Sequence, residues 1–275
     1  MVTVRRALVV VLLAPMLAVG CSAILGIHDP EIVGATEAGI TGDASTPPGT
    51  SRAADASVAV SRMVTIPRPD DAGGGTFQID VTEVTQAAYA AFLAHDTSSV
   101  LQLPACVANT SFKPAAGFAP SLTPDLPVVG VDWCDAYAYC QSVDKRLCGG
   151  TNGVPGALED VAVVGKNEWL AACTKDDAQS YPYGALERPA ACNTSAADAG
   201  AALAVGSKPF CEGGFTGVFD LVGNVAEWVD LCTGTSCATM GGSFSYPMND
   251  VVECRTSSAS SRLTAFADIG FRCCR

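Results

Sequence analysis

Two short stretches between Met63 and Val81 have the side-chain pattern of β-strands. MVTIP at Met63–Pro67 is followed by the turn-rich sequence DDAGGG, and FQIDV at Phe77–Val81 alternates apolar and polar residues. Successive side chains of a strand point to opposite faces of a sheet, so this alternation is typical of half-buried strands. We therefore expect the folded part of the chain to begin at Met63 with two strands.

Three later segments begin with a helix-capping residue. Thr, Asp and Asn favour the N-cap because their side chains accept a hydrogen bond from a free backbone N–H of the first turn. We expect helices that start after Thr85, Asp132 and Asn167 and end near Leu93, Val143 and Cys173. Trp133 and Trp169 lie on two of these helices, and we expect both to be core residues rather than ligand platforms.

Turn signals dominate the sequence from Tyr181 to Arg275, and no internal repeat appears. Strands, helices and irregular chain in this order do not form the alternating βαβ units of a layered α/β protein. The pattern predicts one domain of α+β class over residues 63–275, with low regular secondary structure.

Residues 1–20 have the features of a signal peptide. Arg5 and Arg6 form a positive region, and an apolar run follows from Ala7 to Val19. Spanning a bilayer takes about 20 apolar residues, so this run is too short to favour a transmembrane helix. We expect the protein to be exported and the segment to be removed.

The sequence LAVGC at Leu17–Cys21 resembles a bacterial lipobox, in which the cysteine becomes the lipidated first residue. Ala18 stands where that pattern prefers leucine, and ordinary cleavage that leaves Cys21 free is the alternative. Ser22 rather than aspartate follows the cysteine, which indicates routing to the outer membrane or cell surface. Lipidation of Cys21 would make the membrane a partner through a lipid anchor.

Residues 21–62 form the expected linker between this anchor and the domain. From His28 to Arg62 the chain consists mainly of Ala, Gly, Ser, Thr, Asp and Pro with almost no aromatic residues. Such a composition cannot bury enough apolar surface to fold, so it predicts a disordered tether. A role of this segment in recognition is the alternative.

Composition and charge narrow the classes of function. The hydrophobic content of 49% is enough for a core, whereas the net charge of -12 argues against nucleic acid as a partner. Nucleic-acid affinity rests on Lys and Arg that neutralise phosphates. His28 and His95 are the only histidines, so a site with several imidazole ligands cannot be assembled.

The thirteen cysteines indicate disulfides. Apart from Cys21 they number twelve, an even count, and the chain has no CxxC pair of the kind that zinc sites use. An exported domain with this pattern is expected to be disulfide-rich. Cys232 and Cys237 close a small loop and are the first pair we expect, while the adjacent Cys273 and Cys274 require different partners.

The stretch FDLVGNVAEWVD fits neither a helical nor a strand period. Asp220 and Glu227 flank a glycine, Gly223, that can adopt a positive φ. A loop of this kind can direct carboxylate and main-chain oxygens toward one point, which suits a hard cation such as calcium. The alternative is an ordinary tight turn whose acidic side chains face water.

This stretch, with GGSF at Gly241–Phe244 and GFRC at Gly270–Cys273, resembles the signature of the formylglycine-generating enzyme (sulfatase-modifying factor) family. Upstream segments agree in order: EVTQAAYAAF at Glu83–Phe92, PVVGVDWCDAYAYC at Pro127–Cys140, KRL at Lys145–Leu147 and NEWLAAC at Asn167–Cys173. The resemblance covers roughly Met63 to Arg275 and implies an irregular, lectin-like fold. It also implies that the stretch between Arg146 and Asn167, longer than the family's usual link, is an exposed insertion.

In catalytic members of this family two cysteines follow GGS and hold copper(I), which activates oxygen to oxidise a substrate cysteine to formylglycine. Here Tyr246 stands at the first position, and Cys254 matches the second only with an insertion. One thiolate cannot make the two-sulfur site that soft cuprous ion favours, so copper is not expected. Iron-dependent relatives use several histidines, so non-haem iron is not expected either. We expect Cys254 to be bridged to Cys273 or Cys274; a catalytic Cys254 is the alternative.

The resemblance also implies calcium. Its ligands would be Asp220, the main-chain carbonyls of Gly223 and Val225, and Glu227, with Asn193 at a second ion. Two functions then remain open. The residues favour a non-oxidising, calcium-stabilised surface binding module for a protein or glycan, carried by an exported lipoprotein. The alternative is a formylglycine-generating-type oxidoreductase that acts on an exported protein substrate.

Overall fold

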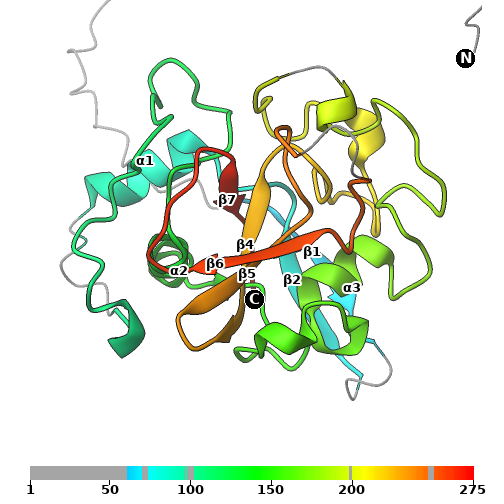
Figure 1. The fold of residues 1–275 in the computed structure, drawn as a ribbon, viewed down its shortest axis with the longest axis horizontal. Coiled ribbons are helices and arrows are strands. Elements are labelled where there is room, and N and C mark those ends of the chain that lie inside the picture. Colours follow the sequence, from blue (N-terminus) through cyan, green and yellow to red (C-terminus); the bar gives the residue numbers. More distant parts are fainter. Residues whose placement is uncertain (1–60, 70–73, 96, 98–101, 198–199, 247–250) are drawn as a thin grey trace, which may run out of the picture. The chain divides into compact units, whose positions relative to one another are not determined.

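The computed structural model describes residues 61–69, 74–95, 97, 102–197, 200–246 and 251–275 (Figure 1). The predicted signal peptide, Cys21 and nearly all of the linker lie outside the described residues. Within the described part of the chain, no helix combines the length and the apolar character needed to cross a bilayer.

The first sheet joins the start of the domain to its last residues. It consists of β1 (Met63–Pro67), β2 (Thr76–Asp80), β3 (Arg146–Leu147) and β8 (Cys273–Cys274). The order is β1-β2-β8-β3 and all neighbours are antiparallel, with Met63 opposite Asp80. Both strands predicted near the start of the domain are thereby confirmed.

The second sheet lies in the region where we predicted mainly turns. It consists of β4 (Ala226–Thr233), β5 (Ser236–Met240), β6 (Ser257–Ser261) and β7 (Ile269–Phe271), in the order β6-β5-β4-β7. The stretch from Ala226 onward is therefore a strand, and the expectation of a loop there is wrong. The reason is burial on both faces: β4 places acidic as well as apolar side chains in the interior, which removes the alternation.

All three predicted helices form behind the expected caps. They are α1 (Gln86–Ala94), α2 (Trp133–Ser142) and α3 (Glu168–Thr174). Each cap side chain accepts a hydrogen bond from a first-turn backbone N–H: Thr85 from Ala88, Asp132 from Asp135, and Asn167 from Leu170. Five short 3-10 helices complete the described elements: η3 (Pro104–Cys106), η4 (Leu158–Asp160), η5 (Val164–Lys166), η6 (Ser195–Ala197) and η7 (Pro209–Cys211).

The second sheet separates two hydrophobic clusters, because β4 points successive side chains to opposite faces. Trp228 packs with α1 and α2, whereas its neighbour Val229 packs with α3 and the first sheet. Figure 1 shows α2 and α3 on different sides of β4. Trp133 and Trp169 are 1% and 0% exposed, so both are core residues as predicted.

Six disulfides pair all twelve domain cysteines. They join Cys106 to Cys134, Cys140 to Cys273, Cys148 to Cys274, Cys173 to Cys254, Cys192 to Cys211 and Cys232 to Cys237. The pairing of Cys232 with Cys237 is confirmed, as are different partners for Cys273 and Cys274. The expected partner of Cys254 is wrong: the bond runs to Cys173 in α3, because β8 is bound instead to α2 and to the segment after β3.

The predicted exposed insertion is only partly exposed. Residues 152–163 reach solvent, but Gly149, Gly150 and Thr151 are buried. The backbone N–H of Gly156 donates to Asp230 and its carbonyl accepts from Cys232, so this segment runs along β4. Hydrogen bonds to the strand therefore hold part of the insertion against the core.

Candidate functional site

A fully buried ion pair lies at the start of β4. Glu227 accepts from Arg272 at both oxygens, from Nε to Oε2 and from Nη2 to Oε1, each at 2.7 Å. Trp169 Nε1 donates to the same Oε2 at 2.8 Å. The side chains of Arg272 and Glu227 are 0% and 1% exposed. This bidentate geometry satisfies the carboxylate with charge-assisted hydrogen bonds and connects β4 to the chain end.

Two further carboxyl groups lie next to this pair. Asp220 Oδ2 accepts from the backbone N–H of Gly206 at 2.6 Å, and Glu83 Oε1 accepts from Asn224 Nδ2 at 2.8 Å. Burial, and then the charge of Asp220, raise the pKa of Glu83 well above its usual value; burial also raises the pKa of Asp220. Asp220 and Glu227 are both buried, so the alternative of a turn with acids facing water is wrong.

The Gly-Asn turn closes over Asn193. Gly223 has φ +73, and a Cβ there would lie 2.4 Å from the Asn193 carbonyl oxygen, so a side chain cannot be accommodated. Asn193 Nδ2 donates to Asn224 Oδ1 at 3.0 Å, while Asn193 Oδ1 is buried without a hydrogen-bond partner in the described structure. Val225 is also buried. The predicted residues are thus brought together at one turn.

The oxygens of this cluster fit calcium only in part. Asn193 Oδ1 is a buried acceptor without a partner among the described residues, whereas the raised pKa of Glu83 favours its neutral form, which can donate a hydrogen bond to Asp220. Glu227 does not fit, because Arg272 occupies both of its oxygens. Among the described residues, no three His, Cys, Asp or Glu side chains are placed to hold a metal. Calcium held through Asp220 and the carbonyls of Gly223 and Val225, with Asn193 at a second ion, stays a prediction.

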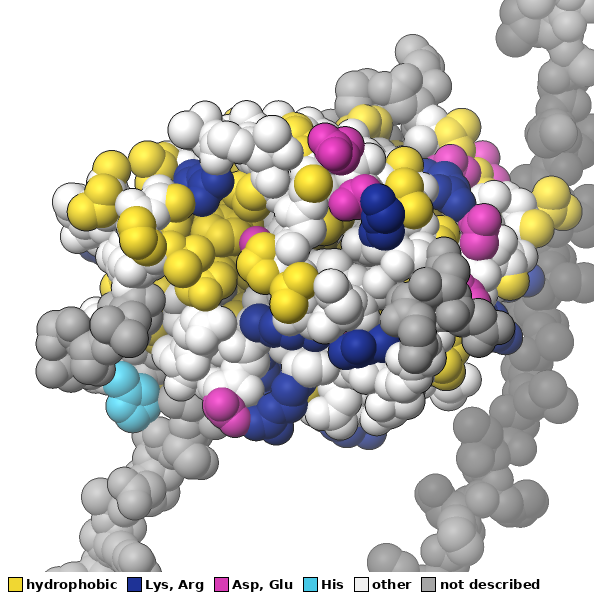
Figure 2. Space-filling model, turned by 90° about the horizontal axis from the view of Figure 1, so that it is seen from below, with side chains coloured by type: hydrophobic (Ala, Val, Ile, Leu, Met, Phe, Trp, Pro, Cys, Tyr) yellow, Lys and Arg dark blue, Asp and Glu magenta, His cyan; other side chains and the backbone are white. Residues whose placement is uncertain are grey.

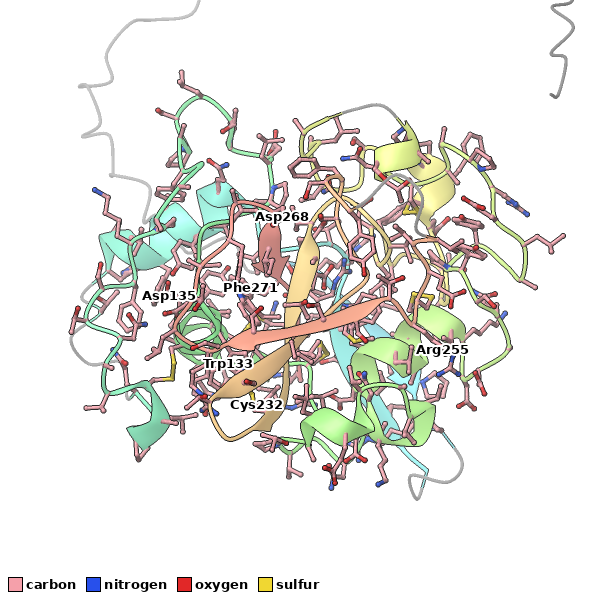
Figure 3. The ribbon with its side chains drawn as sticks, in the orientation of Figure 1. Trp133, Asp135, Cys232, Arg255, Asp268 and Phe271 are labelled. Carbon is pink, nitrogen blue, oxygen red and sulfur yellow. A yellow bond between two sulfur atoms is a disulfide. The ribbon has the colours of Figure 1, made fainter. Side chains whose placement is uncertain are left out.

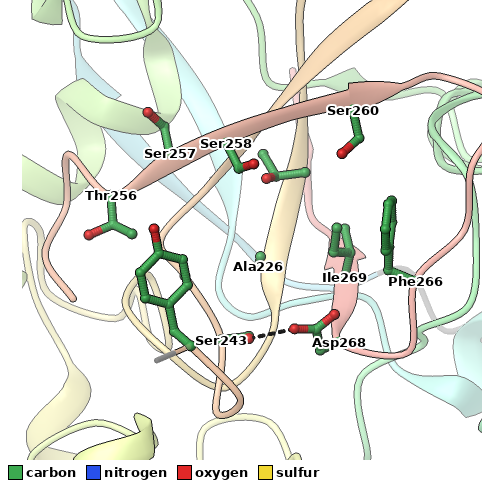
Figure 4. Close-up of a pocket in the computed structure, with 12 residues that line it drawn as sticks. Ala226, Ser243, Thr256, Ser257, Ser258, Ser260, Phe266, Asp268 and Ile269 are labelled. Carbon is green, nitrogen blue, oxygen red and sulfur yellow. Dashed lines mark hydrogen bonds between the residues drawn. The ribbon is translucent and has the colours of Figure 1, made fainter. Parts of the chain in front are cut away.

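A pocket of about 170 Å³ lies beside the GGSF stretch, over the second sheet (Figure 4). Hydroxyl groups line much of it, from Thr239, Ser243, Thr256, Ser257, Ser258 and Ser260. Tyr246 and Phe266 add aromatic rings, and Asp268 adds a carboxylate. The strands β4, β5, β6 and β7 all contribute side chains, so a rigid sheet positions the lining.

Asp268 is held by two serines at one oxygen. Ser243 Oγ donates to Asp268 Oδ2 at 2.8 Å and Ser245 Oγ donates to the same oxygen at 2.5 Å. No hydrogen bond of the described residues reaches the other oxygen, Oδ1. Figure 4 shows Asp268 next to Ser243 at one end of the pocket, with Phe266 and Ile269 on the same side. The carboxylate therefore keeps a fixed position and one acceptor oxygen available to a ligand.

The two positions that correspond to the oxidase thiolates are placed differently. Tyr246 lines the pocket, whereas Cys254 is 0% exposed and bonded to Cys173. A sulfur in a disulfide is not a thiolate and cannot serve as a nucleophile or copper ligand in that form. Cys254, the candidate catalytic residue, therefore forms a structural disulfide.

A second, open groove of about 540 Å³ lies near η5. Arg255 lines it, donates from Nη1 to the Ala162 carbonyl and forms an ion pair with Asp177. Figure 3 shows Arg255 at the end of β6 next to α3, away from Asp268. On the face in Figure 2 the acidic side chains are scattered singly and several basic side chains gather near the middle, so this face carries no broad acidic patch.

Sequence reasoning missed several residues of these clusters. Glu83 begins the EVTQ segment and Arg272 lies within GFRC, so the motif signal was present but carried no indication that the two ends of the domain meet. Asp268 and Thr239 lie outside the quoted motifs. Only the pairing of β4 with β5 and β7 brings them to the pocket.

Comparisons with known proteins identify the fold. A family model described as "Sulfatase-modifying factor enzyme 1-like domain" matches residues 45–275. The crystal structure of CarF is similar at 21% identity and a TM-score of 0.51, over 77% of this chain and 92% of that chain. The fold predicted from the motifs is thereby confirmed.

Two further solved structures are similar. PvdO from Pseudomonas aeruginosa has 20% identity and a TM-score of 0.49, over 78% of this chain and 91% of that chain. Treponema denticola variable protein 1 has 17% identity and a TM-score of 0.48, over 78% and 92%. Comparison with curated protein sequences gave no match.

Proposed function

Because this chain belongs to the sulfatase-modifying factor enzyme 1-like domain family, we propose that it is a non-oxidising member that binds a ligand at the pocket beside GGSF. One observation carries the proposal: Cys254 is bonded to Cys173 in the interior, and Tyr246 lines the pocket in place of a cysteine. At the place where the resemblance implies a copper-binding cysteine, the pocket therefore has the aromatic ring of Tyr246 and several hydroxyl groups.

Chemical reasoning supports a binding role over oxidation. A tyrosine phenol has a pKa of about 10 and is neutral at pH 7. Its oxygen is a hard donor and suits cuprous ion poorly, whereas two thiolates suit it well. An oxidase of the family type would need both sulfurs free, and the six disulfides leave no domain cysteine in thiol form.

The proposal includes an extracytoplasmic location with a lipid anchor at Cys21. Six disulfides support an oxidising compartment, because cytosolic thiols are kept reduced. We also propose that calcium stabilises the turn at Asp220, supported by the buried, unpartnered oxygen of Asn193. Both parts are independent of the pocket and can fail without affecting it.

The test is an oxidation assay with a peptide that carries the cysteine-type sulfatase motif. Copper(I)-loaded protein is incubated with the peptide and oxygen, and mass spectrometry follows the mass loss when a thiol becomes an aldehyde. We expect no conversion, while a catalytic family member in the same assay converts the peptide. Conversion by the wild-type protein would overturn the proposal.

Two variants separate the causes of inactivity. Cys173→Ala releases the thiol of Cys254, and Tyr246→Cys restores the first sulfur position. We expect no conversion by either, since each supplies only one of two changes and Cys254 lies in the core rather than at the pocket. Activity of Cys173→Ala would show that the disulfide alone silences an oxidase.

A further inference from the structure

We propose that the pocket beside GGSF selects a neutral, hydroxyl-rich ligand, with one pyranose ring of a glycan as the group that enters it. This inference rests on the proposed binding function and names the ligand class. Its basis is the chemistry of the lining: many hydroxyls, one carboxylate, two aromatic rings and no basic side chain among the described lining residues.

The hydroxyl groups match a polyol because each side can donate and accept. A serine or threonine hydroxyl offers one donor and two acceptor lone pairs. In β6, Ser258 lies opposite Thr239 and Ser260 lies opposite Cys237, so both serines are on the same face of the sheet. Figure 4 shows their side chains on the pocket side of the strand. A ligand with several hydroxyls can therefore form hydrogen bonds with these side-chain hydroxyls and leave no polar group unpaired.

Asp268 gives the pocket its charge preference. Its Oδ2 is occupied by Ser243 and Ser245, which leaves Oδ1 to accept from ligand hydroxyls in a charge-assisted hydrogen bond. An anionic group placed there would be repelled by the carboxylate and would meet no basic side chain of the described lining. Phosphate, sulfate and carboxylate groups are therefore disfavoured.

The remaining lining and the size of the pocket fit one ring. Phe266, Ile269 and Ala226 provide apolar surface against which the CH face of a sugar can pack. A cavity of about 170 Å³ is smaller than the roughly 300–1,000 Å³ of sites that enclose drug-sized molecules. It corresponds to about five or six waters at about 30 Å³ each, which a ring with several hydroxyls can replace.

The strongest competing occupant is a peptide that adds a strand to β6, the edge of its sheet. Such a peptide bonds to main-chain groups of the edge and requires neither Asp268 nor a free pocket. The two occupants therefore predict different dependence on the pocket side chains, which makes the choice testable.

The experiment titrates the ¹⁵N-labelled domain with individual probes and follows amide shifts by NMR. The neutral probes are the methyl glycosides of glucose, galactose, mannose and N-acetylglucosamine; the anionic probes are glucose 6-phosphate and glucuronic acid. We expect at least one neutral glycoside to shift the amides of Ser258, Ser260 and Asp268 saturably. The anionic probes should bind at least tenfold more weakly.

Variants test the named contacts. We expect Asp268→Asn and Ser260→Ala each to weaken the neutral probe about tenfold or more, with an unchanged ¹⁵N spectrum away from the pocket. Ser261→Ala is the matched control: Ser261 lies in the same strand opposite Ser236, on the other face from Ser260, and it does not line the pocket. We expect this variant to bind as the wild type does.

The results that would contradict the inference differ from the result that would contradict the proposed function. Absence of saturable shifts for every neutral glycoside, equal binding of anionic probes, or unchanged binding in Asp268→Asn would each overturn the inference. An extended peptide that instead protects alternate β6 amides would also overturn it and would move the binding role from the pocket to the sheet edge. Oxidation of the sulfatase-motif peptide would remove the proposed function itself.

Discussion

The two stretches that identify the family have opposite surroundings in this protein. At GNVAEW the polar side chains are buried and paired, with Glu227 bonded to Arg272 and Trp169 in the interior. At GGSF the polar side chains line a pocket, and Asp268 keeps one oxygen without a described hydrogen bond. At the first stretch the hydrogen bonds of Glu227 come from within the protein, whereas the second stretch offers groups to a ligand.

This difference shows how a family fold can persist while its chemistry changes. Breaking the buried ion pair would leave an uncompensated charge in the core, so the fold depends on it. Replacing a pocket residue changes only what the pocket binds, because the sheet beneath is already formed. The predictions below test whether the two stretches separate stability from function in this way.

The largest effect is expected from the disulfide behind the pocket stretch. Removing Cys173–Cys254 with two serine substitutions should lower the free energy of unfolding by about 4.5 kcal/mol in the chain-entropy model, from its separation of 81 residues. Removing Cys232–Cys237, with a separation of 5, should cost about 2 kcal/mol. Urea unfolding of both double variants measures the difference; equal losses would show that strain or packing rather than loop closure sets the effect.

Arg272→Met comes next. It leaves Glu227 buried without its guanidinium, so we expect a loss of about 3–5 kcal/mol in urea unfolding. Arg275→Met is the matched control, because the Arg275 and Asp144 side chains are 55% and 90% exposed. That exposed pair should contribute less than about 1 kcal/mol.

Ser260→Ala in the pocket completes the comparison with a change within about 0.5 kcal/mol, as is usual away from buried networks. A pocket variant as destabilising as Arg272→Met would contradict the separation of stability from binding.

The expected effect of calcium lies between that of Arg272→Met and that of Ser260→Ala. If the Asp220 turn binds the ion, calcium at about a hundred times its Kd should stabilise the domain by about 2.7 kcal/mol, or about 5–10 °C in Tm. Chelation with EGTA should reverse the shift, and magnesium should not replace calcium. Asp220→Asn should reduce the shift, whereas an unchanged Tm after chelation would refute the proposed ion.

The local elements could be predicted because their signals are local. Thr85, Asp132 and Asn167 cap their helices through bonds within one turn, and the alternation in residues 77–81 reports its own strand. The pairing of Cys232 with Cys237 could be predicted in the same way, since the two cysteines are only five positions apart in the chain.

Local sequence patterns therefore settled these elements, and the ordered motifs settled the family. Neither settled where β4 lies: a strand that is buried on both faces and carries acids has no alternation to detect. The partner of Cys254 and the pairing of Glu227 with Arg272 join residues 81 and 45 positions apart. Such contacts depend on how the sheets and helices pack. Only the tertiary structure therefore decided that Glu227 forms a buried ion pair and that Cys254 forms a disulfide.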